Sequence, residues 1–325
     1  MANTAITTPA TTQVHSKLID PGVKKYWFDA YKEVKPSLSK VFQVDSMSEA
    51  YEEHVAYAGL GDAPLVQEGA TYTEDAILHT YNTTLTAAKY GFMVPVTHEL
   101  WDDQREKIAG KTQQSARAVA RKVEDLASNV FNNGQSTSYT SYGDGKPLFS
   151  TDHTRADGGT AQSNASATGI TLTETNLETG IIAMREQLDD RGNMKAIVPN
   201  TLLVPPALEK EAIIITKSDK RSETTDNDAN VYNMTEYTGG RLNVIVWDYL
   251  GAAAGGSDTA WVLLDKVQHQ VCWKWRESPR IVKLPEAVGA KNDVWYWKAR
   301  FRAAYGWTDW RGAWRSAGDG AAYSS

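Results

Sequence analysis

The sequence lacks the features that mark disulfide-bonded, exported and membrane-spanning proteins. It has a single cysteine among 325 residues, Cys272, so no intramolecular disulfide can form. Apolar and aromatic residues surround Cys272 and no pattern there would stabilise a thiolate, which predicts a buried, reduced thiol. No uncharged apolar run approaches the ~20 residues of a membrane span, and residues 1–12 lack the basic start and apolar stretch of an export signal. We therefore expect a soluble, unexported protein.

An excess of positive charge is also absent. The formal net charge is −6, whereas a protein held on nucleic acid by its bulk charge is usually basic. Any contact with DNA must therefore be local. By contrast, the chain is rich in tryptophan, with 11 residues of this type. Large rigid aromatic side chains dominate both cores and interfaces, so this content suits an obligate oligomer as well as a monomer.

The N-terminal segment predicts an arm. Residues 1–13 are rich in Thr and Ala without periodicity and predict a mobile terminus. Residues 14–57 mix charged and aromatic side chains without a strong repeat. Because clustered aromatic residues are costly to leave in water, this arm is expected to lie either on its own body or on a neighbour. The cluster consists of Tyr26, Trp27, Phe28 and Tyr31.

A long hairpin is predicted next, over residues 59–95. Residues 59–69 are rich in turn-forming residues, among them Gly61, Asp62 and Pro64. They lead into a segment in which Thr, Tyr, Val and Phe favour strand.

The clearest helix is predicted over residues 97–131. At about 100° per residue, its small and apolar side chains share one face: Ile108, Thr112, Ala116, Val119, Ala120, Val123, Leu126, Ala127 and Val130. Five cations share the opposite arc: Lys107, Lys111, Arg117, Arg121 and Lys122. At about 1.5 Å per residue the helix would be on the order of 50 Å long, and would act as a spine. The arc is either a solvated face or a surface turned toward DNA phosphates, and few acids interrupt it, chiefly Asp125.

A polar loop and a second helix follow. Residues 135–171 are dominated by Ser, Thr, Gly, Asn and Asp and are too polar to bury. Thr175 and Glu178 form a capping-box pattern that predicts the start of a helix, which Arg191 and Gly192 should end.

The rest of the chain predicts a compact α/β unit closed by a regular strand. Strands are expected at residues 196–204, 242–247 and 260–264, with a helix at 207–217. In the last strand aromatic and small residues alternate with cations, which predicts a half-buried strand in preference to a nucleic-acid stacking platform. Its predicted core face carries Trp295, Trp297, Ala299, Phe301, Ala303 and Tyr305, and its other face Lys298, Arg300 and Arg302.

Three short motifs resemble catalytic or ligand sites, and each lacks a required part. Residues 110–112 read Gly-Lys-Thr, but a phosphate-binding loop needs a glycine where Arg105 stands. Residues 98–102 hold one histidine and two acids without the second histidine of a zinc helix. Residues 150–153 contain Ser, Asp and His too close together for a catalytic relay, so we expect turn chemistry with Asp152 closing on its own backbone. The sequence predicts no catalytic residue, metal or cofactor.

Four segments resemble motifs of a known family. Residues 66–70 (VQEGA) are similar to the family's hairpin tip, and residues 96–103 (VTHELWDD) to the start of its spine helix. Residues 202–208 (LLVPPAL) are similar to the opening of its axial domain, and residues 147–153 (PLFSTDH) to a segment of Mu-type head proteins. By these motifs and by the order of its elements, the chain resembles the major capsid proteins of tailed bacteriophages, which have the Hong Kong 97-like α+β fold. The resemblance covers residues 24–315.

The resemblance implies a division of the chain and a function. It implies an N-terminal arm (residues 1–58) and an extended hairpin loop (59–95). These are followed by the first part of a peripheral domain with the spine helix (96–195), an axial domain (196–272) and the closing strand of the peripheral domain (273–325). The implied function is self-assembly into the icosahedral shell that encloses phage double-stranded DNA. Two alternatives remain: the shell protein of an encapsulin-type bacterial compartment, and a soluble α/β hydrolase or binding protein.

The resemblance also implies partners and surfaces. The partners are copies of the chain in hexamers and pentamers, the packaged DNA by non-specific contact, and portal, scaffold or decoration proteins, in a virion assembled in the host cytoplasm without a membrane. The cations of the long helix would face the genome. The expected intersubunit residues are Tyr26, Trp27, Phe28, Tyr31, Glu68 and Tyr72.

Overall fold

The computed structural model describes residues 24–34, 37–61, 63–72, 74–103, 105–139, 143–219, 230–233, 242–285 and 293–323, with the backbone alone at residues 101, 102 and 105–109. The chain forms two compact units. Unit 1 comprises Met1–Pro36, Ala88–Glu124 and Glu277–Ala303, and unit 2 comprises Ser37–Ala87, Asp125–Arg276 and Ala304–Ser325. Among the described helices, none combines the length and apolar character needed to cross a bilayer.

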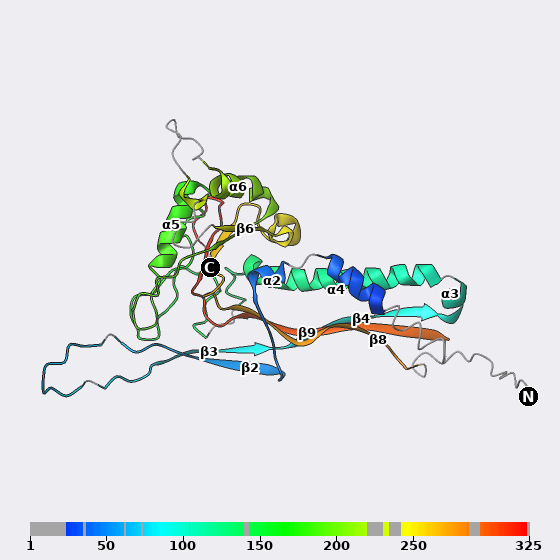
Figure 1. Ribbon diagram of the computed structural model, residues 1–325, viewed down its shortest axis with the longest axis horizontal. Coiled ribbons are helices and arrows are strands. Elements are labelled where there is room, and N and C mark those ends of the chain that lie inside the picture. Colours follow the sequence, from blue (N-terminus) through cyan, green and yellow to red (C-terminus); the bar gives the residue numbers. More distant parts are fainter. Residues whose placement is uncertain are drawn as a thin grey trace, which may run out of the picture. The chain divides into compact units, whose positions relative to one another are not determined.

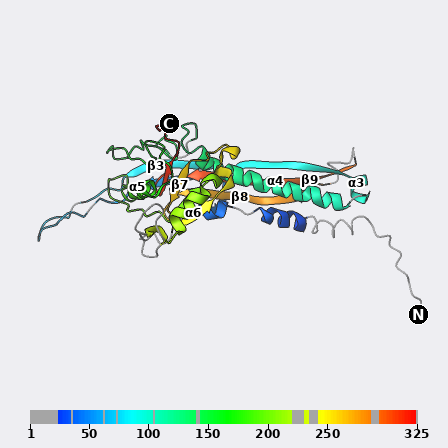
Figure 2. The ribbon, with the colours of Figure 1, turned by 90° about the horizontal axis from the view of Figure 1, so that it is seen from above.

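Unit 1 consists of a long helix along a layer of strands (Figures 1 and 2). The helix predicted over residues 97–131 is confirmed as α3 (His98–Asp103) and α4 (Arg105–Asn132). Strand β4 (Ala88–Thr97) pairs antiparallel with β9 (Val294–Trp307), and β9 lies next to β8 (Val271–Lys283).

The alternation of side chains on β9 explains this layer. Trp295, Trp297, Ala299 and Phe301 are buried, as predicted, whereas the residues between them remain partly accessible. Residues facing one another in an antiparallel ladder share a face, so β4 adds Tyr90, which stacks on Phe301 with ring centroids 5.1 Å apart. The apolar face of the layer is therefore the one that α4 covers. The pattern breaks after Ala303, because Ala304 is buried and Tyr305 is only partly so.

Unit 2 is built on a mixed sheet in the order β10-β7-β5-β6. Its strands are β5 (Thr201–Val204), β6 (Asn243–Val246), β7 (Trp261–Leu264) and β10 (Ala313–Ser316). The predicted strand over residues 196–204 is thus shorter at its start. The predicted helix over 207–217 is a 3-10 turn, η1 (Pro206–Leu208), followed by α6 (Glu209–Lys217). Further 3-10 turns are η2 (Val231–Asn233), η3 (Asp248–Leu250) and η4 (Ala252–Ala254).

Helix α5 (Glu174–Arg185) differs from the prediction at both ends. Its N-cap is Thr173, whose hydroxyl accepts from the Asn176 backbone N–H at 3.3 Å, so the capping box placed at Thr175 was wrong by two residues. The helix ends at Arg185, well before the predicted stop.

The core of unit 2 does not respect the expected domain boundaries. Leu177 and Met184 of α5 are buried in one cluster with Leu202 of β5 and Trp314 of β10. The boundaries expected after residues 195 and 272 would divide this cluster. The helical period of α5 was visible in the sequence, but the period does not reveal which layer a helix packs on.

The hairpin lies earlier in the chain than predicted. Its strands are β2 (Tyr51–Tyr57) and β3 (His79–Thr86), which pair only with each other in the described part. Residues 88–95, assigned by sequence to the hairpin, belong to β4. Because β2 carries charged residues, the sequence predicted it as part of the arm. The residues of β3 and β4 resembled one continuous strand, so the break between them at Ala87 was not predicted. Ahead of the hairpin lie helical residues 24–33, α2 (Leu38–Val41) and β1 (Gln43–Ser46), which pairs parallel with β8.

Candidate functional site

The three catalytic residue types near residue 150 do not form a relay. The His153 imidazole is fully buried, with Nδ1 2.7 Å from Asp144 Oδ2 and Nε2 3.1 Å from Asn164 Oδ1. The ring stacks on Trp310 at 4.2 Å. The Ser150 hydroxyl instead accepts from the Asp152 backbone N–H at 3.1 Å. No nucleophile faces the imidazole within the described residues, so the cluster fastens its own loop.

Asp152 does not close on its own backbone as predicted. Its carboxylate accepts from Lys146 Nζ at 2.8 Å. This hydrogen bond lowers the pKa of Asp152 and raises that of Lys146. The turn at this point is therefore held by an ion pair across six residues.

No metal site is formed within the described residues, where no cluster of three or more His, Cys, Asp or Glu side chains has a geometry suited to a metal. His98 lies 4.0 Å from Trp295, ring to ring, and its Nε2 is 3.5 Å from Asp293 Oδ1. The Gly-Lys-Thr motif lies inside α4. Burial raises the pKa of the Cys272 thiol to about 11, which keeps the thiol protonated as predicted.

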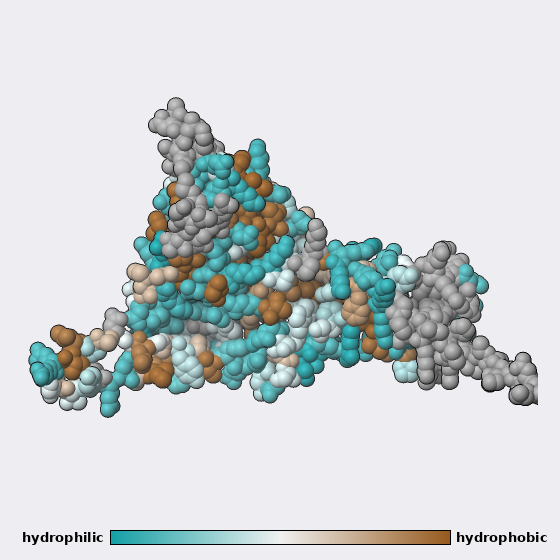
Figure 3. Space-filling model, in the orientation of Figure 1, coloured by the Kyte–Doolittle hydropathy of each residue, from teal (hydrophilic) through white to brown (hydrophobic). Residues whose placement is uncertain are grey.

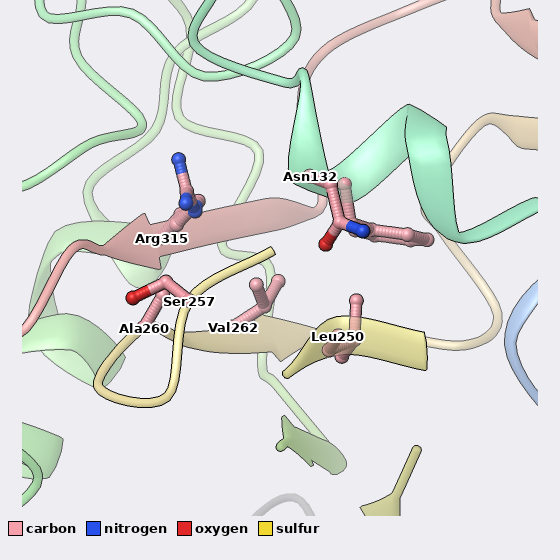
Figure 4. Close-up of a pocket in the computed structure, with 7 residues that line it drawn as sticks. Asn132, Leu250, Ser257, Ala260, Val262 and Arg315 are labelled. Carbon is pink, nitrogen blue, oxygen red and sulfur yellow. The ribbon is translucent and has the colours of Figure 1, made fainter. Parts of the chain in front are cut away.

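A small cavity lies in unit 2, and Figure 4 shows the residues that line it. Phe131, Asn132, Leu250, Ser257, Ala260, Val262 and Arg315 line it. Its volume of about 10 Å³ suits one water molecule. Arg315 is buried, its guanidinium lies 5.9 Å from the Phe149 ring, and burial lowers its pKa to about 10. These residues complete the core beside β10.

Among the described residues, the two most exposed large apolar side chains lie on the connection between β2 and β3, residues 58–78, which we call the hairpin loop. Leu65 is 95% exposed and Tyr72 80% exposed. Glu68, expected at an interface together with Tyr72, is exposed as well. A turn at Gly69, with φ of 81°, carries the chain back toward β3. Figure 3 shows apolar and polar groups side by side on this loop, at the left end of the view.

The base of the hairpin is anchored to other segments of unit 2. Leu85 of β3 is buried with Met47, Cys272 and Ala304. The buried Lys274 Nζ donates to Glu52 Oε2 of β2 at 2.5 Å. The opposite face of β2 exposes Tyr51, Val55 and Tyr57. The hairpin thus has one anchored face and one apolar face that no other described residue covers.

An ion pair fixes the hairpin loop near its two ends, at Gly61 and Asp75. Arg191 Nη1 donates to both carboxylate oxygens of Asp75, at 2.8 and 2.7 Å, and its Nη2 donates to the Ala76 carbonyl. The Gly61 backbone N–H donates to the same carboxylate at 2.7 Å. Together, the Arg191 hydrogen bond and the Gly61 N–H hold the pKa of Asp75 below its usual 3.8.

Substituting Arg191→Gln should accelerate proteolysis within residues 58–78 at neutral pH by several-fold, while the global unfolding transition changes little. The wild-type chain should show the same effect on acidification. Because the Asp75 pKa is lowered, the stabilisation is complete above about pH 4 and is lost as the pH falls through the lowered value. The exposed Arg185→Gln is the matched control. An unchanged cleavage rate in Arg191→Gln would show that this contact does not hold the loop.

The aromatic cluster of the arm is divided between core and surface. Trp27 is 0% exposed, and its indole N–H donates to Ser115 Oγ of α4 at 3.1 Å. Tyr31 stacks on it at 5.6 Å, and burial, followed by the nearby Glu124, raises the pKa of Tyr31 to about 12. Assigning Trp27 to an intersubunit contact was therefore wrong. Tyr26 and Phe28, at 52% and 41% exposure, remain on the surface.

One of the five cations that form the arc of α4 is already paired within its own chain. Lys111, Arg121 and Lys122 are exposed, but Arg117 Nη2 donates to Glu33 Oε2 of the arm at 2.7 Å. The side chain of Lys107 lies outside the described residues. Glu33 could not be placed beside the arc from the sequence, since the two are 84 positions apart.

The comparisons with known proteins give one family and several structures with a similar fold. The model of the family described as phage capsid protein matches residues 80–316. The chain is similar to a chain from Mycobacterium phage Bobi, with a TM-score of 0.54 and 17% identity over 88% of this chain and 91% of that one. It is similar to the virus-like particle from Pyrococcus furiosus, with a TM-score of 0.51 and 9% identity over 91% and 98%. It is also similar to the capsid of bacteriophage JBD30, with a TM-score of 0.50 and 16% identity over 66% and 91%. No curated protein matches it.

Proposed function

Since this chain belongs to the phage capsid protein family, we propose that its hairpin loop lies on a neighbouring copy in a shell of hexamers and pentamers. The chain is a major capsid protein of a phage head, assembles with copies of itself and forms part of the virion. Its α+β fold is of the Hong Kong 97-like type. The family is one of structural proteins, which excludes the hydrolase alternative. An encapsulin-type compartment would share the fold, but the matched family is that of phage capsids.

Exposure of the hairpin loop carries this proposal. Leu65 and Tyr72 leave most of their apolar surface in water, a cost that burial against another molecule removes. The loop begins at the base of the hairpin, which buried residues anchor, and turns back at Gly69. Leu65 and Tyr72 are therefore held away from this anchored base. Negative-stain microscopy of the purified chain tests the proposal at its simplest, because closed shells are expected and stable monomers would exclude it.

We expect unit 2 to contribute the axial contacts around the fivefold and sixfold axes, and unit 1 the peripheral ones. This assignment follows the resemblance, with α5 and β10 moved to the axial side because they share the core of β5 and β7. Portal, scaffold or decoration proteins are further expected partners. The similarity of residues 147–153 to Mu-type head proteins stays a prediction.

We further propose that the cationic arc of α4 contacts packaged DNA. Neutralising two of its exposed members, in Lys111→Gln/Arg121→Gln, should leave shell formation intact and lower the DNA that purified particles retain. The salt dependence of retention should weaken as well, since each lost phosphate contact removes about 0.9 from the slope of log K against log salt concentration. The measurement is the ratio of nucleic acid to protein in particles washed at increasing salt.

Arg117→Gln is the matched control, because the Arg117 side chain is already paired with Glu33 and should contribute less. Equal retention by the double variant and the wild type would identify the arc as a solvated face.

A further inference from the structure

One buried lysine ties the hairpin (β2 and β3, Figure 1) to the neighbouring strand β8. Lys274 of β8 is 8% exposed, and its Nζ donates to Glu52 Oε2 at 2.5 Å and to His54 Nε2 at 2.9 Å. Both acceptors belong to β2 and stand two positions apart, so they share its inward face. We call these three residues the Lys274 tether.

The hydrogen bonds of the tether fix the charge of His54. An ammonium group can only donate, so Nε2 of His54 must accept, and the imidazole is neutral with its proton on Nδ1. A second proton would go to Nε2 and would set two positively charged donors 2.9 Å apart. The tether can therefore keep this form only while His54 is uncharged.

The groups around the tether do not remove this conflict. Those packed against it from other elements are Asp45 of β1, Cys272 of β8, and Thr83 and Leu85 of β3. Of these only Asp45 carries charge, because burial keeps the Cys272 thiol protonated, and the Asp45 carboxylate accepts from the Ser46 backbone N–H at 2.7 Å. Glu52 Oε2 lies 3.6 Å from His54 Nε2 but already accepts from Lys274. Charging His54 would thus set two cations against one shared carboxylate.

Protonation of His54 should therefore loosen the base of the hairpin. Histidine is the side chain whose charge ordinarily changes between about pH 5 and pH 8. The tethered hairpin favours the neutral imidazole, so it binds fewer protons than a released hairpin does. The contribution of the tether to stability is then complete at neutral pH and is lost as the pH falls through the range in which imidazole takes up a proton.

We propose that the Lys274 tether is a pH-sensitive hinge, which holds the hairpin on its own subunit at neutral pH and releases it under mildly acidic conditions. This inference goes beyond the proposed function and rests on it only for the consequence in assembly. A hairpin that moves freely must be ordered when it docks, so shells should form less readily when the hinge is open. The ion pair of Asp75 with Arg191 does not respond in this range, because Asp75 loses its charge only below about pH 4.

Hydrogen exchange of unassembled subunits at about pH 7.5 and about pH 5.5, corrected for the intrinsic exchange rate, tests the hinge. Amide protection in β2 and β3 should fall by at least about 3-fold on acidification. His54→Gln keeps an acceptor for Lys274 without titrating, and should retain full protection at both pH values. His54→Lys carries a permanent charge and should show the low protection at both.

His79→Gln is the matched control, because His79 lies on the same hairpin beside Tyr57 and is exposed. This variant should respond to pH as the wild type does. A response that persists in His54→Gln, that disappears equally in His79→Gln, or that begins only near about pH 4 would overturn the hinge.

The consequence for assembly is measured separately. The concentration needed for shell formation should rise over the same pH range in the wild-type chain and stay constant in His54→Gln. Because exchange is measured on unassembled subunits, it decides on the hinge even where no shells form. A wild-type chain that forms none at any pH overturns the proposed function and leaves the result on the hinge intact.

Discussion

Replacing residues 58–78 by Asn-Gly should leave the subunit folded and abolish shell formation. Tyr57 and His79 are paired in the hairpin, so a two-residue turn can join them with the geometry that Asn-Gly favours. The removed segment is mostly exposed, and the buried contacts of the hairpin lie at its base around Leu85. A shorter connection also costs less loop-closure entropy. The loss should therefore fall on assembly alone.

Size-exclusion chromatography with light scattering measures the outcome, with microscopy of the largest fractions. An equally long Gly/Ser segment in place of residues 58–78 is the matched control, and it should also fail to form shells, because length without the apolar and acidic side chains does not restore the docking. Shells of normal size from either variant would mean that the loop is dispensable.

Substituting Trp27→Ala should cost about 3–5 kcal/mol in the free energy of unfolding. Trp27 is completely buried, stacks on Tyr31, packs edge-on against Phe28 and hydrogen bonds to Ser115. Its removal leaves a cavity between the arm helix and α4. It also removes the hydrogen bond that the Ser115 hydroxyl accepts, while this hydroxyl still donates to the Thr112 carbonyl at 2.7 Å. Denaturant unfolding of unassembled subunits, at a concentration below that of shell formation, measures the cost.

Phe28→Ala is the matched control, with an expected cost of about 1 kcal/mol or less because its side chain is 41% exposed. Equal costs for the two variants would contradict the placement of Trp27 in the core of unit 1. A loss of assembly in Trp27→Ala without a loss of stability would return this residue to the intersubunit contacts.

The burial of Trp27 also changes how the arm should be tested. Deleting residues 1–57 would be expected to release subunits if the segment only clasped a neighbour. That deletion also removes Trp27, Phe42 and Met47, which are buried in their own chain, and the strand β1. It would therefore confuse loss of folding with loss of assembly, whereas excision of the hairpin loop separates them.

Long periodic elements were predictable from the sequence. The spine helix follows from many turns of one repeating apolar face, and β9 from alternation over most of its length. The hairpin was misplaced because the inward face of β2 carries Glu52 and His54, whose partner Lys274 lies 222 and 220 positions away. Polar contacts between distant segments leave no local pattern, so the sequence could not distinguish this strand from an arm.

The surfaces were predictable only in part. The resemblance to the family singled out Glu68 and Tyr72, and both are exposed. Trp27 could have been assigned to the core, because Trp27, Ala30 and Tyr31 follow the i, i+3, i+4 spacing of a buried helical face. The placement of Lys89 beside Arg302 required the register between β4 and β9, which no local pattern specifies.

A cryo-electron microscopy map of shells assembled from the intact chain tests the central claim most directly. The account predicts that density for residues 58–78 crosses to a neighbouring copy in the shell. Density that keeps this loop on the chain it belongs to, or a preparation that contains only compact monomers, would contradict it.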